Sequence, residues 1–251
     1  MILVFKKKRV LAVVVLLVLT ACLMGVFFSP KVASTLAAKK KLPIYSVETT
    51  EKVVALTFDA AWGADKTDKI MDILDEYGMK GTFFLVGFWI DAYPEKVKEI
   101  NQRGFLIGNH STNHPHFNSL SSGQIASEIS VTNMKLKQLT DNDTVYFRAP
   151  FGEYDNRLLD YIENNGMQCI QWDIDTLDWK GLSGGEIANR VLSKVREGSI
   201  ILCHNNADHI VEALPIILTG LKNKGYKSVR LDELVLKESY RIDNNGRQIA
   251  E

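Results

Sequence analysis

Residues 53–59 read Val53-Val54-Ala55-Leu56-Thr57-Phe58-Asp59, an apolar run that ends on a carboxylate. A short run rich in β-branched and aromatic side chains is typical of a buried β-strand. A segment with helical periodicity follows at residues 65–77, and a second short apolar run begins at Gly81. A strand, a helix and another strand in this order predict two parallel strands with the helix packed outside them.

The same alternation continues toward the C-terminus. Further strands are predicted at residues 81–86, 105–110, 145–150, 167–175, 199–204 and 227–231, and further helices at residues 94–103, 122–139, 156–165, 186–196 and 209–224. About seven parallel strands are too many for a small open sheet and slightly few for an eight-stranded barrel. We therefore predict an α/β fold with a distorted (β/α) barrel, and a doubly wound sheet is the alternative.

The first residues have a different composition. Lys6-Lys7-Lys8-Arg9 stand directly before an uncharged stretch from Val10 to Phe28, which is long enough to span a membrane. Because basic flanks stay in the cytoplasm, this predicts a transmembrane or signal-anchor segment with the rest of the chain on the extracellular, wall side. Two alternatives stay open: secretion after cleavage near Ala37 and Ala38, and lipidation of Cys22 in a Leu-Thr-Ala-Cys box.

The domain organisation follows from these patterns. We expect a basic flank at residues 1–9, the anchor at 10–28, a spacer at 29–50, one folded domain at 51–236 and a polar C-terminal tail at 237–251. The 251 residues include 30 basic and 30 acidic side chains, so the formal charge is zero. No nucleic-acid surface is indicated, and a neutral partner and a monomeric chain are expected.

Polar residues stand at the ends of five predicted strands: Asp59, His110, Arg148, Asp175 and His204. In a parallel barrel the carboxyl ends of the strands meet on one face, where the catalytic groups of such folds assemble. A single aspartate or histidine in such a place is more often structural. Five of them in one register predict a functional site.

His110 and His114 are four residues apart, a spacing that points two imidazoles the same way in a helix or tight turn. Two imidazoles in that relation are a common start of a site for zinc or a related divalent metal. The alternative is a pair of capping or solvated histidines in a loop.

Five ordered motifs make the pattern more specific. They are Thr57-Phe58-Asp59, His110-Ser111-Thr112-Asn113-His114-Pro115, Arg148-Ala149-Pro150-Phe151-Gly152, Asp175-Thr176-Leu177-Asp178-Trp179 and Leu202-Cys203-His204. Together they resemble the motifs of the polysaccharide deacetylases, carbohydrate esterase family 4 with its NodB homology domain, over about residues 52–234. The run Phe58-Asp59-Ala60-Ala61-Trp62-Gly63 and the N-terminal segment are most similar to the sporulation-type, PdaB-like branch.

The resemblance implies metal-dependent removal of N-acetyl groups from cell-wall glycan. The first substrate that it implies is the amino sugars of peptidoglycan, and the second is chitin-like oligosaccharide. It implies that Asp59 is the general base and that Arg148 holds it ionised. His204 would protonate the departing amine, with Asp175 orienting its ring. Zn²⁺, with Co²⁺ as the other option, would bind His110 and His114. The substrate pocket would be lined by Trp179, Leu202, Pro150 and Phe151.

The sequence departs from the family pattern at Ala60, where family members carry a second aspartate that is the third metal ligand. Asp65 is a possible substitute, although a place in the first turn of the next helix suits it better. Catalytic sites normally hold a metal with three protein ligands, so activity is in question. The alternative function is therefore a glycan-binding or scaffold protein that has lost catalysis.

Overall fold

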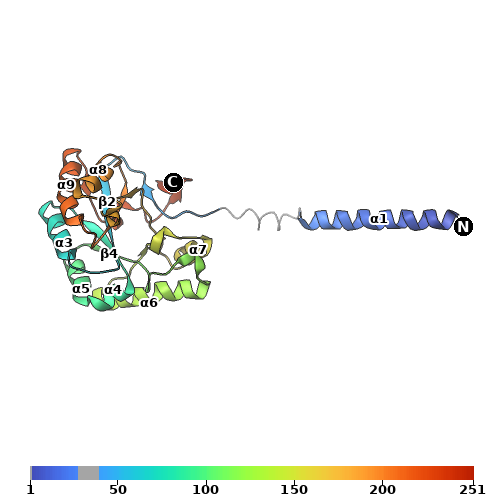
Figure 1. Cartoon of the computed structure of the whole chain (residues 1–251), viewed down its shortest axis with the longest axis horizontal. Coiled ribbons are helices and arrows are strands. Elements are labelled where there is room, and N and C mark those ends of the chain that lie inside the picture. Colours follow the sequence, from blue (N-terminus) through green and yellow to red (C-terminus); the bar gives the residue numbers. More distant parts are fainter. Residues whose placement is uncertain (1, 28–39) are drawn as a thin grey trace. The chain divides into compact units, whose positions relative to one another are not determined.

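The computed structural model describes residues 2–27 and 40–251 (Figure 1). They divide into two units, Met1–Lys40 and Lys41–Glu251. The first unit contains helix α1 (Ile2–Phe27). Within the described ranges, no helix has the length and apolar character needed to cross a membrane. Phe28, which ends the apolar stretch, and the cleavage residues Ala37 and Ala38 lie outside those ranges.

The second unit is built on a curled parallel sheet with the strand order β6-β5-β4-β3-β2-β8-β7. The strands are β2 (Val53–Ala60), β3 (Gly81–Leu85), β4 (Leu106–Asn109), β5 (Tyr146–Phe147), β6 (Gln168–Cys169), β7 (Ile174–Asp175) and β8 (Ile200–His204). A further short strand, β9 (Lys227–Ser228), pairs with the start of β2. This arrangement confirms the expected distorted (β/α) barrel.

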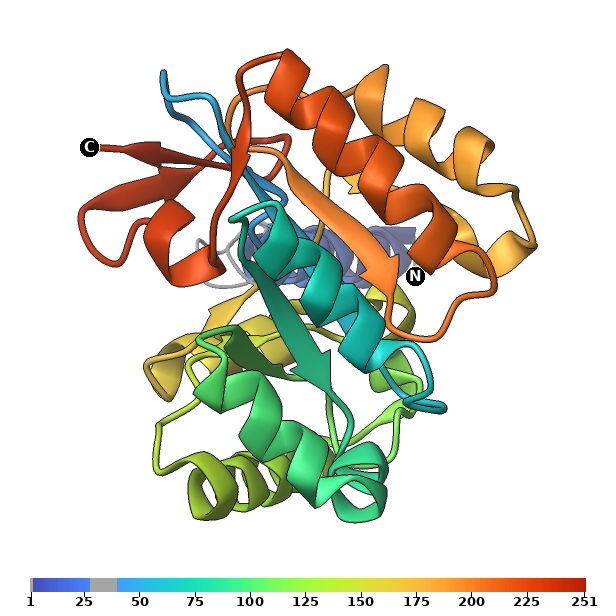
Figure 2. The same ribbon diagram turned by 90° about the vertical axis from the view of Figure 1, so that its left-hand side faces the viewer.

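Helices surround the sheet, as Figure 2 shows for the second unit. They are α3 (Thr67–Glu76), α4 (Gly87–Ala92), α5 (Pro94–Gln102), α6 (Ser122–Thr140), α7 (Asn156–Asn164), α8 (Gly184–Leu192), α9 (Ile210–Asn223) and α10 (Leu231–Leu234). Side chains of β2 alternate between two environments, as a strand with both faces buried requires. Leu56, Phe58 and Ala60 belong to the apolar cluster that includes residues of α3, α8 and α9. Ala55 belongs to the cluster inside the curled sheet.

One predicted strand was wrong, because residues 167–175 form two strands and not one. β6 and β7 lie at opposite edges of the sheet order. Between them, the Gln171 amide donates to the Ile44 carbonyl at 2.7 Å and the Asp173 amide donates to the Ile200 carbonyl at 3.1 Å. The chain thus crosses from one edge of the sheet to the other over a few residues, which brings the two edges close together.

The segments expected to be the end of a spacer and a polar tail also contain ordered strands. β1 (Ser46–Val47) pairs in parallel with β11 (Arg247–Ala250), and β10 (Tyr240–Ile242) pairs antiparallel with β11. Val47 is buried and its amide donates to the Gly198 carbonyl at 3.0 Å. This small sheet therefore joins both ends of the second unit and contacts the segment that leads into β8.

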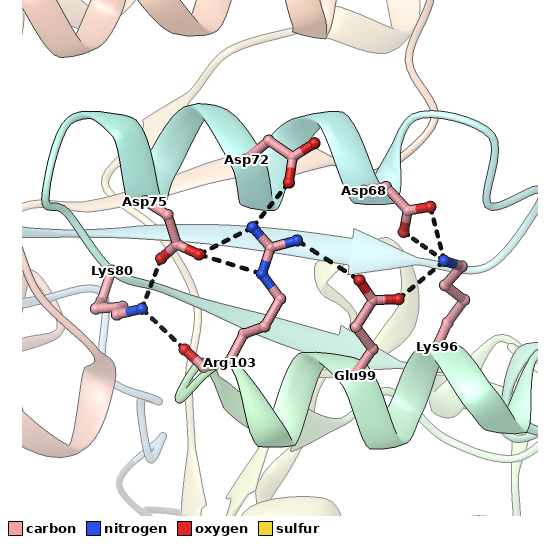
Figure 3. A network of polar contacts seen from close by, with 7 residues as sticks. All are labelled: Asp68, Asp72, Asp75, Lys80, Lys96, Glu99 and Arg103. Carbon is pink, nitrogen blue, oxygen red and sulfur yellow. Dashed lines mark hydrogen bonds and ion pairs between the residues drawn. The ribbon is translucent and has the colours of Figure 1, made fainter.

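A surface network of charges connects α3 with α5 and its C-terminal cap (Figure 3). Arg103 donates to Asp72 at 2.8 Å and to Asp75 at 2.9 Å, and Lys96 pairs with Asp68 at 2.6 Å. Its members are Asp68, Asp72, Asp75, Lys80, Lys96, Glu99 and Arg103. Each exposed ion pair of this kind contributes little to the free energy of folding, so the network adds only modestly to the packing of the two helices.

Candidate active site

The carboxyl ends of the central strands open into a cavity of about 550 Å³. Its walls contain eight of the residues that the sequence singled out: Asp59, His110, His114, Phe151, Asp175, Trp179, Leu202 and His204. Arg148 is completely buried behind Asp59. Pro150 is also buried and is not among the residues that line the cavity, so its contact with substrate stays a prediction.

Asp59 is a buried carboxylate held by a cation. The Arg148 guanidinium donates from Nη1 to Asp59 Oδ1 at 2.7 Å, and its Nη2 donates to the Gln171 carbonyl at 3.2 Å. Burial alone would raise the pKa of Asp59, but the positive charge of Arg148, helped by that of His204, holds that pKa below its ordinary value. Asp59 is therefore ionised near neutral pH and able to accept a proton.

His110 has a fixed ring orientation beside this carboxylate. Its Nδ1 donates to the Arg148 carbonyl at 2.8 Å, so the lone pair of the neutral ring is on Nε2. That Nε2 lies 3.4 Å from Asp59 Oδ2. Burial lowers the pKa of His110, which keeps the imidazole neutral. A neutral imidazole whose other nitrogen is hydrogen-bonded to the backbone is the usual form of a metal-binding histidine.

His204 is the second proton-transfer group, and it lies directly beside Asp59 because the two residues are paired in register across β8 and β2. Its Nδ1 contacts Asp178 Oδ1 at 2.7 Å, and its backbone amide donates to Asp178 Oδ2 at 2.8 Å. Burial acts to lower the pKa of His204, but the hydrogen bond and charge of Asp178 raise it above the ordinary value. The ring is thus prepared to carry a proton.

This geometry corrects the predicted role of Asp175. Its Oδ1 accepts a hydrogen bond from the Leu177 amide at 2.8 Å, and the ring of His204 is oriented by Asp178 instead. Both aspartates belong to the same motif, three residues apart. Asp175 still lines the cavity, and its charge also raises the pKa of His204.

The loops around the cavity contain unusual backbone conformations. Ser111, His114, Phe151 and Leu177 all have positive φ angles, between 54° and 71°. For residues other than glycine such angles are uncommon and cluster at functional sites. His114 is flanked by Phe151, with ring centroids 4.7 Å apart, and by His110 at 5.0 Å. Burial and the neighbouring His110 lower the pKa of His114 to about 4, so this ring is neutral too.

The donor set does not complete a metal site. In residues 2–27 and 40–251, no group of three or more histidine, cysteine, aspartate or glutamate side chains is arranged to hold a metal ion. Asp65 is exposed in the turn before α3, whose first-turn acid is Asp68, so neither role expected for Asp65 is found. The two neutral imidazoles therefore lack the third protein ligand that catalytic zinc sites normally have.

The position of Ala60 adds a physical reason. Ala60 is fully buried on the helix-facing side of β2, whereas the next residue, Ala61, lines the cavity. A carboxylate at position 60 in this backbone would point into the apolar cluster that contains Phe58. Ala61 is only partly buried, and it lines the same cavity as His110 and His114 while also packing against that cluster.

Other residues of the cavity were not predicted as site residues. Asp178, Trp62, Ala61 and Trp172 all contribute to the site or its walls. Trp62 and Asp178 were contained in the motifs that revealed the resemblance, so their nearness to the site was readable from the sequence. Their side-chain directions were not, because both follow the end of a strand, where the alternation of faces stops.

A curled parallel barrel with a carboxylate–arginine pair and a histidine–carboxylate pair at the carboxyl ends of its strands defines an acid–base site of the hydrolytic type. Residues 46–170 match the model of the polysaccharide deacetylase family. A peptidoglycan-N-acetylglucosamine deacetylase of Bacillus cereus is 36% identical over 185 residues, which cover 72% of this chain and 67% of that protein. The chain belongs to the polysaccharide deacetylase family.

Two further relatives are informative about its place in that family. YlxY of Bacillus subtilis, an uncharacterised protein, is 33% identical over 77% of this chain, and the match spans 60% of YlxY. The crystal structure of BA3943 from Bacillus anthracis, described as a CE4 family pseudoenzyme, is similar with a TM-score of 0.75 and 32% identity, covering 83% of this chain and 73% of that one. A mutant of BA3943 is described as having restored enzymatic activity.

Proposed function

We propose that this chain is a de-N-acetylase that acts on the amino sugars of peptidoglycan in the cavity at the carboxyl ends of its strands. The observation that carries the proposal is the placement of two oppositely tuned acid–base groups on neighbouring strands. Asp59 is held ionised by Arg148, and His204 is held ready for a proton by Asp178. Such a difference in proton affinity is what a hydrolytic site needs in order to run base and acid steps at one pH.

Hydrolysis of an N-acetyl group uses these residues in turn. Asp59 takes a proton from water as its oxygen bonds to the acetyl carbon, and His204 gives a proton to the amide nitrogen as the carbon–nitrogen bond breaks. The products are acetate and a free amine on the sugar. A bound divalent metal, Zn²⁺ or Co²⁺, would polarise the carbonyl in a metal-dependent relative, but the residues found here do not complete its site. We therefore expect slow turnover by the natural chain.

A second function is favoured by one specific observation. Ala60 and Ala61 leave His110 and His114 without a carboxylate partner for a metal, and the similar protein BA3943 is described as a pseudoenzyme. A chain that kept the cavity and lost the reaction would serve as a glycan-binding or scaffold protein.

An assay of acetate release from N-acetylated peptidoglycan fragments distinguishes the two functions. The full chain is assayed with added zinc or cobalt and with a chelator, beside Asp59→Asn. Acetate release that disappears in Asp59→Asn supports the enzyme. Absence of release under every metal condition, together with retained binding of the fragments, refutes the enzyme and supports the binder. A gain on metal addition and a loss with chelator would support metal dependence.

We also propose that the N-terminal segment keeps the domain at the membrane on its wall side. The support is the sequence alone, where a basic cluster at residues 6–9 precedes the apolar stretch. Fractionation of cells that produce the full chain should place it in the membrane fraction. A shortened chain in the medium would contradict the anchor and favour cleavage. A role in sporulation rests on the branch resemblance, and it predicts production of the chain only in sporulating cells.

A further inference from the structure

We propose that Trp62 is a sugar-binding residue, and that it extends the cavity so that it takes a segment of N-acetylated glycan longer than one sugar. The inference rests on the proposed function and deepens it, since it names a further residue and the length of the ligand. Trp62 lies two residues beyond β2 and lines the same cavity as Asp59 and His204.

The exposure of aromatic side chains is the first observation. In the described part of the chain, three phenylalanine or tryptophan side chains are largely exposed: Trp62 at 66%, Phe151 at 57% and Trp179 at 58%. All three line the cavity. Large apolar side chains that gather in one exposed place mark a binding surface, whereas single ones scattered over a protein do not.

The second observation is the arrangement of these rings. Trp62 meets the ring of His114 edge-on, with centroids 5.1 Å apart and an interplanar angle of 67°. The ring of Phe151 also contacts the ring of His114, with centroids 4.7 Å apart. Trp62 also rests against Phe88, with centroids 5.9 Å apart. The indole is therefore in contact with two other rings, and it keeps most of its surface exposed where it lines the cavity.

The third observation is the rigid support of the loop that carries Trp62. The carbonyl of Gly63 accepts two hydrogen bonds, from Trp89 Nε1 at 2.8 Å and from Asn205 Nδ2 at 2.9 Å. Gly63 has a φ of 72°, and any β-carbon there would collide with the Asn206 amide. Lys66 Nζ donates to the Asn206 carbonyl at 3.1 Å. A loop held at three points loses little conformational entropy when a ligand binds.

These observations together identify the ligand chemistry. A pyranose ring has an apolar face of C–H groups and an edge of hydroxyl groups. An aromatic ring can pack against the C–H face while the hydroxyl groups stay hydrogen-bonded to water. The polar centre of the cavity, at Asp59 and His204, suits the N-acetyl group of one sugar. Trp62 then provides a surface for a neighbouring sugar of the same chain.

The test uses calorimetry to measure how tightly the full chain binds N-acetylglucosamine and its β-1,4-linked dimer and tetramer. We expect affinity to rise with length in the natural chain. Trp62→Ala should lose about tenfold in affinity for the tetramer, the loss expected for one aromatic contact. The same variant should bind the single sugar as the natural chain does, and Trp62→Phe should keep most of the affinity.

The control is Met134→Ala, since Met134 is 64% exposed on α6 and outside the cavity lining. It should bind every oligomer as the natural chain does, and circular dichroism should show all variants folded. Equal tetramer affinity in Trp62→Ala and the natural chain would overturn the inference. Acetate release is followed in the same samples. Binding that depends on Trp62 without acetate release supports the role of Trp62 and refutes the deacetylase. Acetate release with the same tetramer affinity in Trp62→Ala supports the deacetylase and refutes the role of Trp62.

Discussion

Asp59 is the residue on which the site depends most, because it is a carboxylate taken almost completely out of water. Arg148 neutralises it and lies over the Phe84 ring, with 4.2 Å between the guanidinium carbon and the ring centroid. An intact buried pair adds little net stability, since attraction is offset by the loss of hydration. Removal of one partner leaves the other charge buried and unpaired, which is costly.

Replacement of Arg148 by methionine should therefore destabilise the fold. We expect Arg148→Met to lower the free energy of unfolding by about 3–5 kcal/mol, the cost of a stranded buried charge. Arg157→Met is the matched control, because its ion pair with Asp155 lies at the surface and should cost at most about 1 kcal/mol. Urea denaturation of both variants measures the difference. Equal losses would show that Asp59 does not need its cation.

Asp178 should control the titration of His204. The pKa of His204 is raised, so the ring stays charged to higher pH than an ordinary histidine and loses its proton as pH rises through that value. In Asp178→Asn the burial effect is no longer offset, and the pKa should fall. Acetate release, where it depends on charged His204, should then decline at lower pH than in the natural chain.

The titration is measured by NMR of the His204 ring, which needs no turnover. Asp175→Asn is the control, because Asp175 acts on His204 only through its charge at a distance. It should lower the pKa less than Asp178→Asn does. A larger effect of Asp175→Asn would restore the role that the sequence assigned to Asp175.

Positions 60 and 61 should respond differently to a carboxylate. Ala60→Asp places a charge among apolar side chains and should cost about 3 kcal/mol or more of stability. Ala61→Asp places it at a partly buried position that lines the cavity of His110 and His114, and we expect a smaller loss of stability and tighter zinc binding. Denaturation and zinc calorimetry check both variants. A stable Ala60→Asp that binds zinc would show that β2 ends differently from the geometry described here.

At the scale of elements, the periodic segments were predicted well and the crossing between β6 and β7 was not. Residues 167–175 read as one apolar strand, because local pattern carries no information about which edge of the sheet a residue pairs with. In the folded chain, the side chain of Asp173 determines which edge of the sheet β7 joins. Its carboxylate accepts hydrogen bonds from the Ile200 amide at 2.9 Å and from Ser199 Oγ at 3.0 Å, and so fixes β7 beside β8.

Asp173→Ala should therefore loosen the edge of the sheet near the site. Loss of its hydrogen bonds should lower the free energy of unfolding by about 2 kcal/mol and speed amide exchange in β7 and β8. Asp160→Ala is the control, because Asp160 is exposed and pairs only with the partly exposed Lys41 among the contacts described. Its loss should stay within about 1 kcal/mol. Unchanged exchange in Asp173→Ala would mean that backbone pairing alone holds β7.

For the whole molecule, the sequence located the site because a parallel barrel brings strand ends to one face. That rule placed Asp59, His110 and His204 together without any knowledge of contacts. It could not distinguish Asp175 from Asp178, since the choice depends on the path of the loop after β7. Nor could it assign residues 237–251, whose polar composition conceals two short strands, β10 and β11, that pair with each other, β11 also pairing with Ser46 and Val47.

The proposed function requires that the assembled acid–base groups remove acetyl groups from glycan. The most direct measurement is mass spectrometry of defined peptidoglycan fragments after incubation with the full chain, zinc present, beside Asp59→Asn. We predict a free amine on N-acetylglucosamine residues with the natural chain and none with the variant. Fragments that keep every acetyl group in both samples would contradict the account.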